Sequence, residues 1–109
     1  MDGEISTDEV SELLDDGHDV RIVDIRDEVS FEREHIPGSE NVPFHELHTR
    51  IQEFDGAERV VTVCPQGQAS IQAARLIGSY EGSADATVES MRGGLDEWRE
   101  KYDLVSGGE

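Results

Sequence analysis

Cysteine, long apolar runs and basic residues are all scarce in this chain of 109 residues. With a single cysteine no internal disulfide can form, which favours a reducing compartment. No apolar stretch approaches the roughly 20 residues of a membrane-spanning helix. The acidic N-terminus is not followed by the apolar region of a secretory signal. We therefore expect a cytoplasmic protein that has no membrane as a partner.

The basic residues number 9, against 26 acidic ones, and leave a net charge of −17. Nucleic acids and anionic membranes are bound through basic faces, so neither is an expected partner. Self-repulsion at this charge destabilises a compact state unless salt screens it. Apolar segments separate the acids, which argues against a disordered acidic chain. We favour a folded protein adapted to a salty cytoplasm, because scarce lysine with abundant acids resembles the composition of haloarchaeal proteins.

The acids are also unevenly distributed along the chain. Residues 1–55 hold 4 basic and 17 acidic side chains, whereas residues 56–109 hold 5 and 9. No acid occurs between Arg59 and Tyr80, and this segment contains the cysteine, Cys64. The gap has two interpretations: a buried strand and helix that exclude acids, or a site for a thiolate and an anionic donor.

Apolar periodicity predicts an alternation of helices and strands. Ser6 and Glu9 form a capping box, which starts the first helix. We expect helices over 6–17, 28–34, 44–54, 69–80 and after 94, and strands over 20–25, 59–63 and 87–91. This alternation predicts an α/β fold with a mostly parallel central sheet and helices on both faces. At this length we expect a single domain over 1–109, with a core of about 5–104 and a frayed tail over 105–109.

Cys64 ends the most apolar predicted strand and is followed by a short loop and a helix. Loop N–H groups and a helix N-terminus both favour a negative charge, and the thiolate is the reactive form of cysteine. The alternative is that Cys64 is a small buried apolar residue. We favour the nucleophile, because the loop and the first helical turn contain no acid.

The carboxyl ends of parallel strands meet at one edge, where such sheets bind ligands. Asp24 and Arg26 follow one predicted strand, and Arg92 and Gly93 follow another, so all four are expected beside Cys64. Asp24 and Arg26 form either an acid–base pair or, as we favour, an ion pair that fixes the loops. His45 and His48 are three apart, which is weak evidence for zinc, and we expect a solvated face instead.

Four segments, in order, resemble the signatures of single-domain rhodanese-like sulfurtransferases. Val-Asp-Ile-Arg at 23–26 resembles a strand-ending Asp-x-Arg, and the segment 31–39 resembles a helix that runs into His-Ile-Pro-Gly-Ala. Residues 64–70 occupy the place of Cys-x-x-Gly-x-Arg-Ser. Residues 91–98 resemble a terminal Gly-Gly-x-x-x-Trp motif. The resemblance covers most of the chain and implies a rhodanese-like single domain.

The resemblance implies persulfide chemistry at Cys64. The thiolate would take the outer sulfur of a small anionic donor such as thiosulfate and pass it to cyanide, an external thiol or a protein acceptor. No metal and no organic cofactor is implied. The anion-binding nest and the supporting residues would be Gln66, Gly67, Gln68, Ala69 and Ser70, together with Asp24, Arg26, Arg92 and Gly93. His35 resembles the histidine that orients the Pro37-Gly38 turn, the alternative being a base for Cys64.

The chain departs from this family pattern within the loop. Ala69 stands where many members have arginine, no residue from 65 to 70 is basic, and Pro65 removes one N–H donor. We therefore expect thiosulfate to be a weak substrate unless Arg26 or Arg92 supplies the charge. Ser70 stands where the Cys-x5-Arg loop of phosphatases has its arginine, which argues against a phosphatase.

Two other functions stay open. One is a sulfur relay, loaded by a protein desulfurase, which delivers sulfur to a protein partner. The other is a non-catalytic interaction module of the same fold. Retention of Cys64 argues against the module, and the neutral loop favours the relay over thiosulfate chemistry.

Overall fold

A parallel sheet forms the centre of the computed structural model, which describes residues 2–107. Its strand order is β1-β5-β4-β2-β3, and every strand pairing is parallel. The strands are β1 (Asp2–Ile5), β2 (Arg21–Asp24), β3 (Glu40–Asn41), β4 (Arg59–Val63) and β5 (Thr87–Met91). The helices are α1 (Thr7–Asp15), α2 (Glu28–Arg33), α3 (Ala69–Gly78) and α4 (Gly94–Lys101), with short 3-10 turns η1 (Phe44–Glu46), η2 (Ile51–Phe54) and η3 (Glu81–Ser83).

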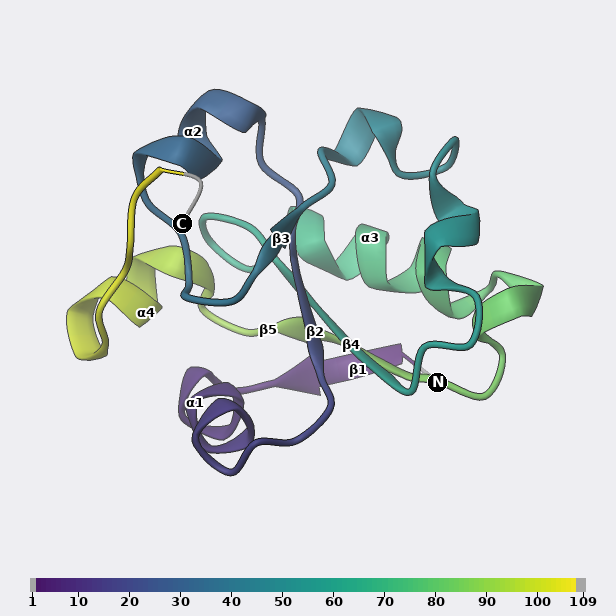
Figure 1. Cartoon of the computed structure of the whole chain (residues 1–109), viewed down its shortest axis with the longest axis horizontal. Helices are drawn as coiled ribbons and strands as arrows, with labels where there is room; N and C mark the ends of the chain where they lie inside the picture. Colours follow the sequence, from purple (N-terminus) through teal and green to yellow (C-terminus); the bar gives the residue numbers. More distant parts are fainter. Residues whose placement is uncertain (1, 108–109) are drawn as a thin grey trace.

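The helices cover both faces of the sheet (Figure 1). One apolar cluster joins α3 to the sheet and to the 3-10 segment, and it contains Ala73, Ile77, Leu47 and Phe54. The other cluster joins α1 and α4 to the opposite face through Val10, Leu95 and Trp98. The middle strand β4 is buried along Val60–Val63, as its nearly continuous apolar sequence predicts. The expected α/β fold with a parallel sheet and helices on both faces is confirmed.

Three elements differ from the sequence expectations: β1, the two-residue strand β3, which pairs with β2, and the segment 44–54. The N-terminal strand β1 was not predicted, and it pairs with β5 at the edge of the sheet. The segment 44–54, expected to be one helix, consists of the 3-10 turns η1 and η2 joined by a hydrogen-bonded turn over 47–50. Leu47 and Phe54 are fully buried but Phe44 is exposed, so the apolar spacing does not define one continuous helical face.

The segment after α4 folds back toward α2. His35 and Val105 exchange two backbone hydrogen bonds, at 2.8 and 2.9 Å, and the Gly107 N–H donates to the Glu32 carbonyl at 2.7 Å. Of the residues expected to fray, Val105 and Gly107 therefore have these contacts, and 108–109 lie outside the described residues. Among residues 2–107, no helix has the length and apolar character required to cross a bilayer.

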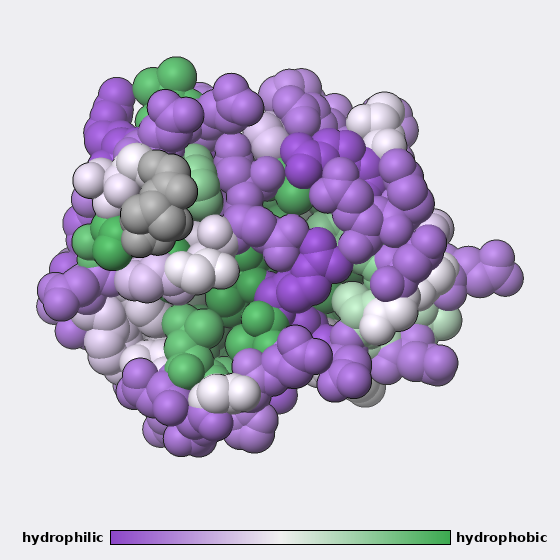
Figure 2. Space-filling view, in the orientation of Figure 1, coloured by the Kyte–Doolittle hydropathy of each residue, from purple (hydrophilic) through white to green (hydrophobic). Residues whose placement is uncertain are grey.

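Hydrophilic residues cover most of the face in Figure 2. Arginines form several of the ion pairs of the molecule: Arg21 with Glu40, Arg50 with Glu46 and Glu53, and Arg59 with Glu89. Exposed pairs of this kind contribute little stability each, about 0–1 kcal/mol. The excess of acids over bases therefore leaves a surface of strongly negative charge around a conventional apolar core.

Candidate active site

Cys64 lies immediately after the central strand β4, where the chain turns into the loop that precedes α3. Its residue exposure is 2%. The carbonyls of Cys64 and Pro65 accept hydrogen bonds from the N–H groups of Leu95 and Asp96, at 3.0 and 2.9 Å. These donors belong to the first turn of α4, which has no partner for them within its own helix. The α4 N-terminus thus holds the carbonyl side of the loop, which leaves N–H groups on the side of the sulfur.

Glycines permit the close approach of the loop to α4. Gly67 has a φ of +85°, and a Cβ there would lie 2.8 Å from the Gly93 nitrogen. Gly94 has a φ of +65°, and its Cβ would lie 2.6 Å from the Cys64 carbonyl oxygen. L-residues rarely adopt such φ values, and real Cβ atoms do not come this near to backbone. The two glycines therefore serve backbone packing around Cys64.

Three groups of the loop and α3 approach the Cys64 sulfur. The N–H groups of Gly67 and Ser70 donate to Sγ at 3.1 and 3.3 Å, and the Ser70 hydroxyl oxygen lies 3.3 Å from it. Ser70 belongs to the first turn of α3, where the helix dipole adds a partial positive charge. No acidic residue is present in that turn. The sulfur is thus surrounded by donors that favour a negative charge.

These donors overcome the effect of burial on the thiol. Burial raises the pKa of Cys64, but hydrogen bonds from the Ser70 hydroxyl and from the N–H groups of Ser70, Gln66 and Gly67 lower it. The net result is a pKa below the ordinary value of a cysteine. Lowered pKa values of this kind are typical of reactive rather than structural cysteines.

A pocket of about 360 Å³ opens over Cys64. Its lining residues are Cys64, Pro65, Gln66, Gln68 and Ala69. None of these residues is an Asp, Glu, Lys, Arg or His. The pocket therefore offers a substrate backbone N–H groups and neutral side chains, and no cation from its own wall.

Asp24 and Arg26 lie at the end of β2, next to β4. The Arg26 guanidinium donates to both carboxylate oxygens of Asp24, the shortest distance being 2.8 Å, and to the Glu34 carbonyl at 2.6 Å. The Arg26 and Asp24 side chains are 12% and 1% exposed. This buried ion pair joins the end of β2 to the end of α2, and neither residue belongs to the wall of the pocket over Cys64.

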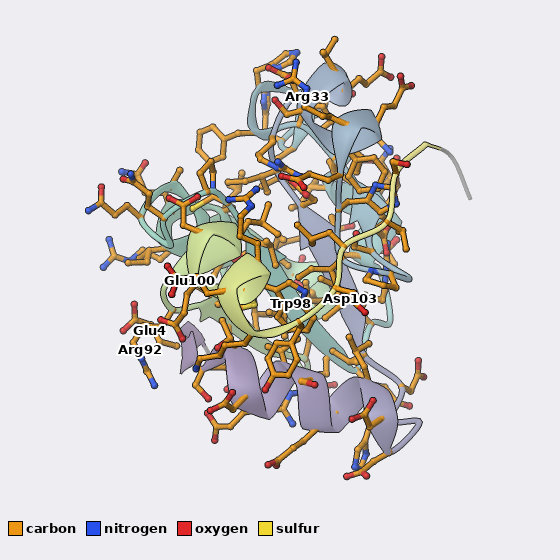
Figure 3. All side chains as sticks on the ribbon, turned by 90° about the vertical axis from the view of Figure 1, so that its left-hand side faces the viewer. Glu4, Arg33, Arg92, Trp98, Glu100 and Asp103 are labelled. Carbon is orange, nitrogen blue, oxygen red and sulfur yellow. The ribbon has the colours of Figure 1, made fainter. Side chains whose placement is uncertain are left out.

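Arg92 and Gly93 follow β5 at the same edge of the sheet. The Arg92 side chain lies on the surface near Glu4 and extends away from the fold (Figure 3). After the hydrogen bonds from Ser6, which have the larger effect, Arg92 helps to lower the pKa of Glu9 in α1. Its charge therefore faces β1 and α1, and Arg92 does not line the pocket. Gly93 contributes backbone beside Gly67.

His35 and Trp98 have structural surroundings. His35 is 2% exposed, stacks on Phe31 with ring centroids 3.9 Å apart, and has its Nδ1 2.6 Å from the Phe31 carbonyl. The Trp98 indole donates to the Asp103 carbonyl at 3.1 Å, beneath α4 (Figure 3).

The histidines considered for zinc lie on the surface. His45 is exposed, and its Nε2 lies 3.6 Å from the Glu46 carboxylate. Within residues 2–107, no group of three or more His, Cys, Asp or Glu residues is arranged to hold a metal ion.

Two hydroxyl residues behind Ser70 were not predicted from the sequence. Thr62 on β4 donates to the Ser70 carbonyl at 2.7 Å, and the hydroxyls of Ser70 and Ser90 lie 2.6 Å apart. All three residues are fully buried. Thr62 and Ser90 stand opposite each other in the β4–β5 ladder, which the sequence could reveal only if the strand register were known.

Known proteins resemble this chain in sequence and in fold. Residues 6–101 match the Rhodanese-like domain family. Thiosulfate sulfurtransferase GlpE of Pseudomonas fluorescens is 40% identical over 81 residues, 74% of this chain and 72% of that protein. Bacillus subtilis YrkF, whose name marks it as a candidate sulfur carrier protein, is 31% identical over 68% of this chain and 40% of its own length. A rhodanese-like domain protein from Staphylococcus aureus superposes with a TM-score of 0.79 at 21% identity, covering 97% of this chain and 99% of that one.

The chain therefore belongs to the rhodanese-like domain family. Within the chain, the lowered pKa of the single cysteine marks the end of β4 as the candidate site.

Proposed function

We propose that the protein is a sulfurtransferase that carries sulfane sulfur as a persulfide on Cys64. The observation that carries this proposal is the set of donors around one buried sulfur, from Gly67, Ser70 and the α3 N-terminus. Relatives named as thiosulfate sulfurtransferases and as a candidate sulfur carrier support the same chemistry.

The reaction divides into two half-reactions. The Cys64 thiolate attacks the outer sulfur of a donor such as thiosulfate; a sulfur–sulfur bond to Cys64 forms, the donor's own sulfur–sulfur bond breaks, and sulfite leaves with the electron pair. Cyanide or a thiolate then attacks the outer sulfur of the persulfide, and the Cys64 thiolate leaves. With a single cysteine the acceptor must be external, and no step needs a metal or an organic cofactor.

Backbone N–H groups of the loop stabilise the persulfide. The N–H groups of Gly67 and Ser70 already bond Sγ. Gln68 and Ala69 precede or begin α3, where N–H groups lack helical partners, and both residues line the pocket. Their N–H groups are therefore suited to the terminal sulfur, which carries the negative charge of the persulfide.

A second candidate, the sulfur relay, is favoured by the neutral wall of the pocket. Thiosulfate is a dianion, and a charge-assisted contact to its sulfonate would require a cation that Arg26 and Arg92 do not place there. In the relay, Cys64 would take sulfur from a persulfide on a desulfurase and deliver it to a protein acceptor. Both candidates share the Cys64 persulfide and differ in donor.

The test is the intact mass of the chain after incubation with each donor. The buffer contains molar potassium chloride, because we also propose that the acidic surface is adapted to high salt inside the cell. We expect an adduct of one sulfur atom that is absent from Cys64→Ser. Formation with thiosulfate, and thiocyanate production from cyanide, support the enzyme; formation only with a desulfurase and its sulfur source supports the relay. Absence of an adduct with every donor would contradict both and leave the interaction module.

A further inference from the structure

Behind the nucleophile lies a short chain of hydroxyl groups. The Ser90 and Ser70 hydroxyl oxygens are 2.6 Å apart, and the Ser70 oxygen is 3.3 Å from the Cys64 sulfur. Ser90 comes from β5, Ser70 from α3, and Cys64 from the end of β4. Three elements therefore meet in one line of polar atoms that ends at the sulfur.

Ser90 has few other ways to satisfy its hydroxyl. It is fully buried, and its neighbours along β5, such as Met91 and Val88, are buried and apolar. Within residues 2–107 the hydrogen-bond partner of the Ser90 hydroxyl is Ser70 alone. Thr62, opposite Ser90 in the ladder, directs its own hydroxyl to the Ser70 carbonyl instead. The Ser90 hydroxyl therefore hydrogen-bonds to Ser70.

The two ionisation states of Cys64 differ in the number of protons that the line from Ser90 through Ser70 to the sulfur must accommodate. In the thiolate state Ser90 donates to Ser70 and Ser70 donates to Sγ, so every hydroxyl proton has an acceptor. In the thiol state the S–H adds a third proton to a line of three atoms joined by two contacts, so in every orientation one of the three protons has no acceptor within the line. Unsatisfied buried donors are costly, and linked hydrogen bonds reinforce one another. The arrangement therefore favours the thiolate.

We propose that Ser90 is a positioning residue that acts through Ser70: it orients the Ser70 hydroxyl proton toward the Cys64 sulfur and so stabilises the anionic nucleophile. The proposal rests on the proposed function in that Cys64 reacts as a thiolate. A hydrogen bond that only tied β5 to α3 would support the fold in both ionisation states alike. The two roles can therefore be separated by a pH profile.

The experiment measures alkylation of Cys64 by iodoacetamide as a function of pH, followed by intact mass. Because the chain has one cysteine, the signal has a single source. In the natural chain the rate rises with pH as thiolate forms, with its midpoint below that of an ordinary thiol, because the Cys64 pKa is lowered. In Ser90→Ala we expect the midpoint to move up by about 0.5–1 pH unit, and the rate well below the midpoint to fall roughly 3–10-fold. The plateau at high pH should be unchanged.

The control is Ser83→Ala, another buried serine, whose hydroxyl donates to the Ile77 carbonyl away from Cys64. It should leave the midpoint unchanged even if it lowers stability. Ser90→Thr, which keeps the hydroxyl, should retain most of the natural profile. In a Ser70→Ala background, Ser90→Ala should add almost no further shift, because its effect passes through Ser70.

An unchanged midpoint in folded Ser90→Ala, or an equal shift with and without Ser70, would overturn the proposal. A measurement on the natural chain covers the case in which Ser90→Ala does not fold. The Ser90 Cβ chemical shift should titrate with the midpoint of the Cys64 Cβ signal, and a Ser90 signal that stays constant contradicts the coupling. The alkylation assay contains no sulfur donor, so its result is independent of whether Cys64 accepts sulfur.

Discussion

The neighbouring strands β4 and β2 end at the same edge of the sheet, but the ionisable residues that follow them have opposite surroundings. After β4, the Cys64 sulfur accepts hydrogen bonds from the N–H groups of Gly67 and Ser70 and contacts the Ser70 hydroxyl, and these neutral groups lower the pKa of the thiol. After β2, the full positive charge of Arg26 is neutralised by Asp24 and bonded to the Glu34 carbonyl. Cys64, after β4, therefore lines a pocket, whereas the charge of Arg26, after β2, is buried in an ion pair.

This difference shows why proximity in the fold does not make a cation part of a site. Arg26 lies at the edge that holds Cys64, but its side chain is 12% exposed and its guanidinium has protein acceptors. A buried pair of this kind contributes mainly by avoiding an unpaired charge. The loop after β4 needs no ion pair, because dipoles of a fixed loop and a helix N-terminus stabilise a single sulfur anion.

The largest effect is expected from breaking the pair after β2. Arg26→Met leaves the buried Asp24 carboxylate without its partner, and we expect the free energy of unfolding to fall by about 3–5 kcal/mol. Arg26→Lys keeps the charge but loses the two-pronged contact, so its loss should be smaller. Urea denaturation in molar potassium chloride measures both. If Arg26 acted on the donor instead, Arg26→Lys would retain stability and lose thiosulfate turnover.

A smaller effect is expected from disturbing the loop after β4. Gly67→Ala adds a Cβ 2.8 Å from the Gly93 nitrogen at a φ of +85°, so the loop must shift away from α4. We expect a loss of about 1–3 kcal/mol of stability and at least a roughly tenfold slower alkylation of Cys64, because the N–H donors move off the sulfur. The matched control is Gly38→Ala, which has a φ of +84° but no atom within 4 Å of the added Cβ. It carries the backbone strain without the clash and should leave alkylation unchanged.

The smallest effect is expected from giving the pocket the cation that it lacks. Ala69→Arg places a guanidinium at the exposed N-terminus of α3, on the pocket wall. We expect kcat/KM for thiosulfate to rise about tenfold, the equivalent of one charge-assisted hydrogen bond. Ala69→Met, which adds length without charge, should not reproduce the gain. Initial rates of thiocyanate formation at several salt concentrations measure it, and a gain that does not decline with salt would argue against an electrostatic cause.

Much of this site follows from local sequence patterns. The apolar run ending at Cys64, the acid-free loop and the following amphipathic helix together predict a thiolate at a strand end. The order of signatures from Asp24 to Gly93 placed the other strand ends beside it. Cys64 and Asp24 do lie at the ends of neighbouring strands, because strand burial, helix capping and loop chemistry are local properties of consecutive residues; the thiolate itself stays a prediction.

Other features could not be predicted because they depend on contacts between distant residues. The strand Asp2–Ile5 contains Asp, Gly and Glu, which are poor strand formers, and it exists through its ladder with β5. Segment 44–54 has helical spacing, yet the burial of Leu47 and Phe54 under α3 is achieved by two short turns. Propensity is a weak guide wherever packing against another element decides the backbone.

The composition and the local pattern of the chain establish an acidic α/β domain with one cysteine at the end of a buried strand. Tertiary structure alone decides which groups surround that cysteine. It buries the expected Arg26–Asp24 ion pair against the Glu34 carbonyl and turns Arg92 outward near Glu4, so the pocket is neutral. It also brings Ser90, 26 positions away in the sequence, to the hydroxyl that faces the sulfur. The reason is physical: register and helix packing set distances between segments, and no run of consecutive residues contains that information.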